Sequence, residues 1–260
     1  TLRLERGGGL VVLRAAKSGR DWTTEMREYA RRRVAELGAL ALDGYVLKKD
    51  SPSCGMQRVK VYDANGAPSK DGVGLFAEEL LRTMPLLPVE EEGRLNDHRL
   101  RENFFERVFA YRRLKDLFAG FWRPADLVRW HTAEKLLLLS HDPASFKRLG
   151  RLVAEAGRRD RAELVREYMA GFMTALAKPA SPKRQRAVLE RILGYFRPAI
   201  DAEAKRDLLE AIEDFRSGLT PLATPIAIAR HYARRFGAVY IQGQTYLQPH
   251  PKELALRSRI

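Results

Sequence analysis

Short apolar runs flank one long amphipathic segment in the amino-terminal part of the chain. Residues 10–13 and 44–48 are apolar runs of strand length, and residues 22–40 follow the helical spacing. The apolar face of that helix is formed by Met26, Ala30, Val34 and Leu37. Strand, helix and strand in this order predict a βαβ unit with parallel strands and a right-handed crossover. In such sheets ligands bind at the carboxyl ends of the strands.

Weaker patterns follow before the composition changes. Residues 59–62 predict a short strand, and residues 73–84 predict a helix that follows a glycine-rich loop. The loop at 72–74 lacks the Lys and Ser or Thr of a nucleotide-binding loop, so we interpret it as structural rather than as a phosphate cradle. The three glutamates at 90–92 are expected to be solvated and to form an acidic joint between two domains, with a boundary near residue 94.

From residue 96 onward the pattern is helical. The first segment has an aromatic-rich apolar face, which is expected to pack into a core. Further helices are predicted near residues 125–141, 144–157, 159–177, 183–197, 202–217 and 221–236. Prolines between these segments suit first-turn or linker positions. We therefore predict a mixed, predominantly α fold, with a partial α/β domain over 1–94 and a larger all-α domain over 95–260.

The net charge of +14 is concentrated in the helical half. Residues 1–94 carry 16 Lys and Arg against 14 Asp and Glu, whereas residues 95–260 carry 31 against 19. A positive field favours nucleic acid as the partner, and a well-solvated arginine-rich surface is the alternative. No apolar run approaches the roughly 18 residues of a membrane span. The single cysteine excludes an internal disulfide, which agrees with a reducing cytoplasm. From these two observations we expect a cytoplasmic protein without a membrane partner.

That cysteine lies in the segment Ser51-Pro52-Ser53-Cys54-Gly55, directly after the second apolar run. Ser-Pro favours an extended path followed by a turn, and Gly55 permits a backbone conformation closed to other residues. We therefore expect a tight turn at the end of a strand. By composition alone, a lone cysteine is more often a small buried hydrophobe than a reactive thiol.

The cysteine segment resembles the motif of the thiouracil desulfidase family. Residues 72–76 and 88–95 resemble the version of that domain that is fused to a YbgA-like helical domain. Landmarks similar to those of the helical family follow at residues 130–137, 192–196, 218–222 and 244–251. The resemblance covers nearly the whole chain.

The resemblance implies hydrolytic removal of sulfur from a thiolated uracil at a [4Fe–4S] cluster held by three cysteines. By its position in the motif, Cys54 would be the third cluster ligand. The two other family cysteines lie upstream of the turn and have no counterpart here, so we expect the α/β domain to be N-terminally truncated. Ser51 and Ser53 are candidate catalytic residues, one of which would bind the substrate or orient the attacking water. The alternative is that they cap the turn.

Two residues near the start of the helical half are candidate contacts to RNA. His131 and Lys135 lie one helical turn apart on a single face and are expected to contact phosphate or base edges. The alternative for His131 is a core histidine bonded to a backbone carbonyl. The chain also departs from the family pattern at Arg191, where a histidine is expected.

The carboxy-terminal part adds further candidates. Arg230, Arg234 and Arg235 are expected to contact phosphate, with Arg230 and Arg234 on one face of the last long helix. Tyr246 is a candidate for stacking on an unpaired base. For Tyr246 we favour the alternative, in which its segment packs back onto the helices.

Two functions from different classes follow. The first is an iron–sulfur-dependent desulfidase acting on thiouridine in tRNA, with the α/β domain performing the chemistry and the helical domain binding the RNA. The second is a non-catalytic RNA-binding or protein-interaction protein whose cluster domain is degenerate. The domain fusion and the charge asymmetry fit the first, which is our leading hypothesis, and the absence of two expected cysteines is the best support for the second.

Overall fold

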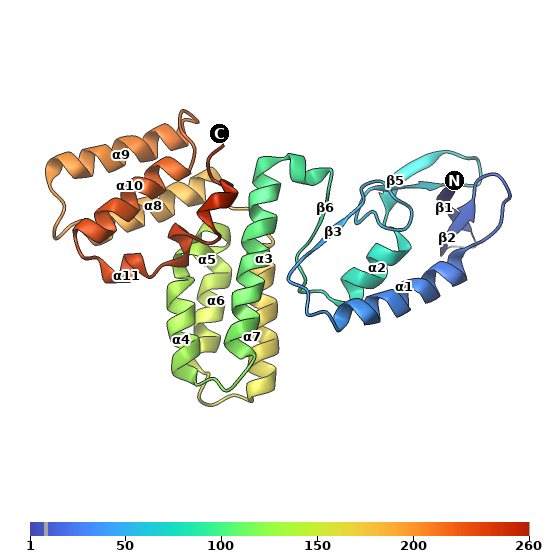
Figure 1. Ribbon diagram of the computed structural model, residues 1–260, viewed down its shortest axis with the longest axis horizontal. Coiled ribbons are helices and arrows are strands. Elements are labelled where there is room, and N and C mark those ends of the chain that lie inside the picture. The colour runs from blue at the N-terminus through green and yellow to red at the C-terminus, as the bar shows by residue number, and fades with distance from the viewer. Residues whose placement is uncertain (8–9, 260) are drawn as a thin grey trace. The chain divides into compact units, whose positions relative to one another are not determined.

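The computed structural model describes residues 1–7 and 10–259 and divides into two compact units, Thr1–Phe104 and Phe105–Ile260. The first unit contains a small mixed sheet with two helices, and the second is built from helices (Figure 1). The predicted fold class, predominantly α with an α/β amino-terminal part, is confirmed. Within the described residues, no helix has both the length and the apolar character needed to cross a membrane.

The first unit has two separate sheets. Strands β2, β1, β4 and β5 are adjacent in that order, with β1 and β2 antiparallel, β1 and β4 parallel, and β4 and β5 antiparallel. The second sheet is the parallel pair of β3 and β6. The elements are β1 (Leu2–Gly7), β2 (Leu10–Ala15), α1 (Thr23–Gly38), β3 (Tyr45–Leu47), β4 (Val59–Tyr62), β5 (Pro68–Gly72), α2 (Leu75–Thr83), β6 (Val89–Glu91) and the 3₁₀ turn η1 (Arg94–Asn96).

The predicted βαβ unit is wrong in its pairing, although each of its elements is present. β2 and β3 lie in different sheets, because β2 pairs with its sequence neighbour β1 as an antiparallel hairpin. In that register Leu4 is opposite Leu13, so both side chains enter one core. Local pairing of adjacent strands satisfies the backbone of β2 without a crossover.

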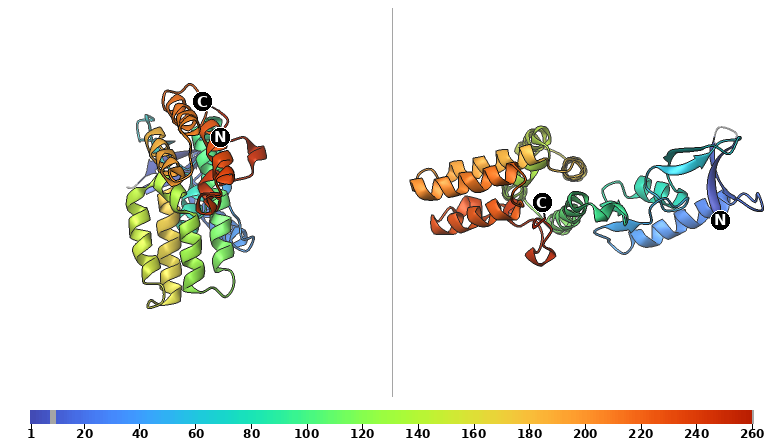
Figure 2. Two further views of the ribbon diagram at one scale, coloured as in Figure 1. Left: turned by 90° about the vertical axis from the view of Figure 1, so that its left-hand side faces the viewer. Right: turned by 90° about the horizontal axis from the view of Figure 1, so that it is seen from above.

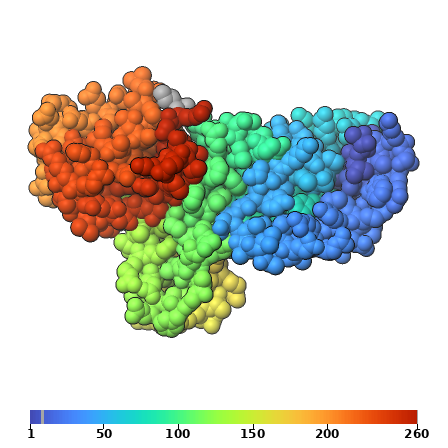
Figure 3. Space-filling model, viewed as in Figure 1, coloured from blue at the N-terminus to red at the C-terminus, as the bar shows by residue number. Residues whose placement is uncertain are grey.

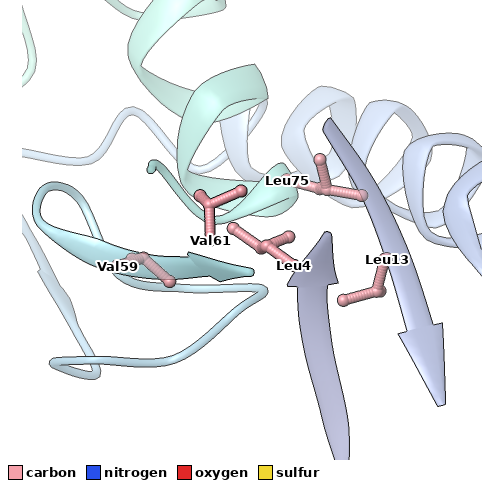
Figure 4. Packing of buried hydrophobic residues seen from close by; sticks show 5 residues of the cluster. All are labelled: Leu4, Leu13, Val59, Val61 and Leu75. Atoms are coloured by element: carbon pink, nitrogen blue, oxygen red, sulfur yellow. The ribbon is translucent and has the colours of Figure 1, made fainter. Parts of the chain in front are cut away.

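The core of the first unit lies between the larger sheet and the two helices. Five side chains from β1, β2, β4 and α2 converge there, each at most 2% exposed (Figure 4): Leu4, Leu13, Val59, Val61 and Leu75. Trp22 and Met26 pack against this cluster from the start of α1. Since Ala30, Val34 and Leu37 are also buried, the apolar face predicted for α1 is the one that faces inward.

In the second unit, α5 packs against α6, α7 and α8, and α8, α9 and α10 pack against one another (Figure 2). The carboxy-terminal segment, red in Figure 3, lies on these helices. The elements are α3 (His98–Phe118), which spans the division between units, α4 (Pro124–Ala133), α5 (Lys135–His141), α6 (Pro143–Ala154), α7 (Arg161–Leu176), α8 (Pro182–Phe196), α9 (Ala202–Arg216), α10 (Ala223–Arg235), α11 (Val239–Gln242) and the turns η2 (Thr245–Leu247) and η3 (Lys252–Leu254).

The single helix predicted over 125–141 is instead two helices, α4 and α5, divided at Glu134. The side chain of Gln244 is inserted at this point. Its Nε2 donates to the Thr132 carbonyl at 2.9 Å, and its Oε1 accepts from the Leu136 amide at 3.2 Å. These two backbone groups would bond to each other in an uninterrupted helix, so the inserted amide accounts for the break.

Candidate functional site

The segment after β3 folds into a tight turn around the cysteine. The Gly55 amide donates to the Ser51 carbonyl at 2.8 Å. The Ser51 hydroxyl accepts from the amides of Ser53 and Cys54 at 3.3 and 3.2 Å. Ser51 therefore caps the turn, which is the alternative role considered for it.

The second serine lies beside the thiol. Ser53 Oγ is 3.0 Å from Ser51 Oγ and 3.4 Å from Cys54 Sγ, so the three side chains form one hydrogen-bonded chain. Cys54 is a free, partly exposed thiol. Burial, followed by the charge of Cys54, raises the pKa of Tyr45 on β3. The arrangement gives the sulfur a hydroxyl partner on a fixed turn.

The first turn of α2 holds the cysteine turn from the other side. The amide of Leu75 donates to the Pro52 carbonyl at 3.3 Å, and the amide of Phe76 donates to the Ser53 carbonyl at 2.9 Å. The first amides of a helix have no partner within the helix, and here the cysteine turn supplies the acceptors. These amides are therefore engaged by protein backbone, in agreement with a structural role for the loop at 72–74.

Two glycines are required by close packing in this region. A Cβ at Gly74 would lie 2.4 Å from the carbonyl of Ser53 and 2.7 Å from the amide nitrogen of Cys54. A Cβ at Gly55 would lie 2.4 Å from Val59 Cγ2. The reason expected for Gly55 was wrong, because its φ is not among the positive values of the described residues. Space, not backbone conformation, excludes other residues at this position.

Two of the glutamates at 90–92, Glu90 and Glu91, are not solvated, which corrects the sequence-based expectation, whereas Glu92 is exposed. Glu90 and Glu91 are 4% and 2% exposed, because they lie on β6 in register with β3. Glu91 Oε1 accepts from the Met56 amide at 2.9 Å, just after the cysteine turn. Glu92 Oε2 accepts from the Lys49 amide at 2.7 Å, just before it. Glu91 on β6 and Glu92 directly after it thus hold both ends of the turn.

The residues present do not complete an iron–sulfur site. A [4Fe–4S] cluster is typically held by about four thiolates, or three with one iron left open, and this sequence contains one cysteine. Among residues 1–7 and 10–259, no group of three or more His, Cys, Asp and Glu side chains is placed to hold a metal ion. Cys54 is thus the one cysteine sulfur that the chain offers where such a cluster needs at least three.

The arginines predicted to contact RNA separate into two groups. Arg230 and Arg234 line a cavity of about 190 Å³ together with the amide side chains of Gln242, Gln244 and Gln248. Arg235 instead lies 3.5 Å from Asp201 and over the ring of Phe236. The structure brings the first two together and directs the third toward α9.

The stacking role considered for Tyr246 is wrong. The side chain is 0% exposed, and its hydroxyl donates to Gln185 Oε1 at 2.6 Å. Arg257 lies over its ring at 5.2 Å. The ring has no free face for a base, and its segment packs onto the helices, as the favoured alternative expected.

His131 is not a cationic phosphate contact. It is 8% exposed, and burial, followed by the charge of Lys135, lowers its pKa to about 4, so it is neutral near pH 7. Nδ1 lies 2.8 Å from the Tyr168 hydroxyl rather than at a backbone carbonyl, and the ring stacks on Phe146. Lys135 remains partly exposed, with Nζ 5.7 Å from the ring centre of Tyr240.

A buried ionic cluster in the second unit was not predicted. Glu106, 2% exposed, pairs with Arg257, and its other oxygen lies 3.1 Å from Nε2 of His141. Nδ1 of His141 lies 2.7 Å from the Lys178 carbonyl. These residues are far apart in the sequence. The sequence signal that could have indicated this cluster is a charged residue within an otherwise apolar helix face.

Comparison with known proteins finds different matches for the two parts of the chain. Residues 2–92 match the family model described as 2-thiouracil desulfurase, and residues 135–251 match the model described as a protein of unknown function, DUF1722. The uncharacterized protein YbgA of Escherichia coli (strain K12) is 28% identical over 164 residues, which span 63% of this chain and 97% of that protein. No solved structure matches the chain. The chain therefore matches the 2-thiouracil desulfurase family in its amino-terminal part and is similar to YbgA in its helical part.

Proposed function

We propose that this protein removes sulfur from thiouridine in RNA, with tRNA as the substrate class. The reaction is a hydrolysis: the thiocarbonyl carbon gains the oxygen of water, the C–S bond breaks, and sulfur leaves as hydrogen sulfide. Oxidation states do not change overall. The first unit would carry the chemistry and the second would bind the RNA.

One observation carries the catalytic part of the proposal. Within the region that matches the desulfurase family, the backbone around Cys54 is held by the amino terminus of α2, by Glu91 on β6 and by Glu92 directly after it. A buried cysteine that served only as a small hydrophobe would need no such support. Cys54 is instead partly exposed and hydrogen-bonded to a serine.

The serines have distinct proposed roles. Ser51 positions the turn, because its hydroxyl accepts from two turn amides. Ser53, whose Oγ is 3.4 Å from Cys54 Sγ, is the residue that would contact the thiocarbonyl or the attacking water. Cys54 is the one thiolate that this chain offers to a cluster.

Charge supports RNA as the substrate. The excess of Lys and Arg over residues 95–260 is +12, against +2 over residues 1–94. A free base would gain little from such a field, whereas a folded polyanion would be attracted by it. The reaction on a free thiouracil would need only the first unit.

The experiment is an anaerobic assay of the chain with tRNA that contains thiouridine. Sulfide release and loss of the thionucleoside are measured together with iron and acid-labile sulfide per chain. We expect release that is lost in Cys54→Ala, is reduced in Ser53→Ala, and is unchanged in Ser69→Ala, a matched control on β5. Release that is independent of Cys54 would contradict the proposal.

A second function is favoured by the single cysteine. In this alternative the chain is a basic RNA-binding protein that does not catalyse desulfidation. Bound tRNA without sulfide release and without iron would establish it.

A further inference from the structure

The second unit contains an open cavity of about 340 Å³, which shares no lining residue with the arginine-lined one. Its size falls within the roughly 300–1,000 Å³ typical of small-ligand sites. It is bordered by α4, α5, α6, α8 and α11, all labelled in Figure 1. The lining residues are His131, Thr132, Lys135, Phe146, Tyr195 and Tyr240.

Aromatic rings dominate the lining. Tyr195 and Tyr240 form a tilted pair with ring centres 4.9 Å apart, and His131 and Phe146 are stacked with centres 5.2 Å apart. Tyr195 is 40% exposed, so part of its ring surface is accessible to a ligand. Partly exposed aromatic rings around a concave site are the usual platform for an unpaired base.

The polar character of the lining matches a nucleotide. Lys135 is the cation of this set, and none of the six described lining residues is acidic. Burial, together with the neighbouring Tyr195, raises the pKa of Tyr240 to about 12, so the phenol stays neutral. The cavity therefore offers neutral rings for a base and one cation for a phosphate.

We propose that this cavity binds an unpaired nucleobase of RNA, stacked on Tyr195 and Tyr240, with Lys135 at the adjoining phosphate. The assignment rests on the proposed RNA substrate and locates a contact to it outside the Cys54 turn. In this proposal the residues that stack on the base are Tyr195 and Tyr240, which line a cavity, and not Tyr246, whose ring is buried.

The test is the affinity of the full chain for tRNA, measured by fluorescence anisotropy over a series of salt concentrations. Tyr195→Leu and Tyr240→Leu are each expected to weaken binding about tenfold, the effect of losing one stacked base. Their salt dependence should match that of the wild type, because no phosphate contact is lost. Lys135→Met should instead lower the slope of log K against log salt by about 0.7 to 0.9.

Matched variants separate stacking from indirect effects. Phe121→Leu removes an 83% exposed ring of the same unit that does not line the cavity, and should leave the affinity unchanged. Tyr240→Phe keeps the ring and should bind like the wild type. If Tyr240→Leu does not fold, Tyr195→Leu decides the matter, because Tyr195 is 40% exposed and its replacement leaves a smaller void in the core.

The outcomes distinguish this inference from the proposed function. Wild-type affinity in both leucine variants, with Cys54-dependent sulfide release intact, would overturn the base pocket alone. Weakened binding in both, with no sulfide release from any variant or from the wild type, would support the pocket and contradict the desulfidase. A wild-type chain that binds a protein partner but no tRNA would overturn the pocket and the RNA substrate together.

Discussion

The residues around Cys54 hold its turn in place through contacts that depend on where the fold brings them. The sequence allowed a tight turn to be predicted, because Ser-Pro and Gly are local signals. It could not indicate Glu91, whose acceptor oxygen serves an amide 35 residues earlier in the chain. A run of glutamates normally indicates solvent, and only the pairing of β6 with β3 buries this one.

Gly74→Ala should destabilise the first unit by about 2 kcal/mol or more, the range for overpacking against a rigid neighbour. The new Cβ would meet the Ser53 backbone at 2.4 Å, and a backbone carbonyl cannot rotate away as a side chain would. Urea unfolding measures the effect. Gly120→Ala is the control, because its Cβ would have no atom within 4 Å, and equal stability of the two variants would contradict the packing argument.

Glu91→Ala should cost about 1–3 kcal/mol, the cost of leaving a buried donor without its acceptor. The Met56 amide would lose the Glu91 carboxylate, which is 2% exposed. Glu92→Ala is the matched comparison, since Glu92 is exposed and water can replace it at the Lys49 amide. Chemical denaturation of both variants decides the point. Equal losses would show that burial does not matter here.

At the scale of elements, most helices were predictable and most pairings were not. Helical spacing, prolines at the first turns of α4, α6 and α8, and capping side chains such as Asp160 and Ser181 are local. Strand partners are not local, so the βαβ unit expected from residues 10–48 became a hairpin and a separate parallel pair. The division of α4 from α5 depends on Gln244, which is 108 residues from Leu136.

Gln244→Ala tests whether the inserted amide stabilises this break. Gln244 is 4% exposed and satisfies two backbone groups, so its removal should lower the stability of the second unit by about 1–3 kcal/mol. Faster hydrogen exchange is expected at the Leu136 amide. Gln248→Ala, at an exposed position nearby, should change neither. Slower exchange at the Leu136 amide would instead mean that this amide bonds to the Thr132 carbonyl once the Gln244 side chain is removed, so that α4 and α5 join into one helix.

At the scale of the molecule, buried titratable groups in the second unit link its stability to pH. His131 has a pKa of about 4 in the folded chain, below its ordinary value of 6.5. As the pH falls below 6.5, the unfolded chain therefore takes up a proton before the folded chain does. Stability is retained above that pH and is lost on acidification toward pH 4. Burial also lowers the pKa of His250, which adds a loss of the same sign.

Unfolding in urea at pH values from 7 to 4 should show this loss, amounting to about 3 kcal/mol from His131 at the lower limit. His131→Gln should flatten the dependence between pH 6.5 and 4, whatever its effect at pH 7. His231→Gln, at an exposed position on α10, should retain the wild-type slope. If the pH dependence of stability in His131→Gln equalled that of the wild type, the loss on acidification would not come from a neutral buried imidazole at His131. Against the effect of burial, Arg257 and His141 hold the pKa of Glu106 at about 2, below its ordinary value of 4.5, so the stability that this carboxylate contributes is present above pH 4.5 and is lost as the pH falls from there toward 2.

The bonds between α2 and the cysteine turn give the first unit a built-in reporter. Because the Phe76 amide donates to the Ser53 carbonyl, hydrogen exchange at that one amide records whether the turn is in place. Substrate analogues, oxidants or metals that act on Cys54 through a movement of the turn will expose the Phe76 amide to solvent, whereas those that act on the sulfur alone will not. A single spectroscopic probe on a helix can thus separate chemistry at the thiol from distortion of its support.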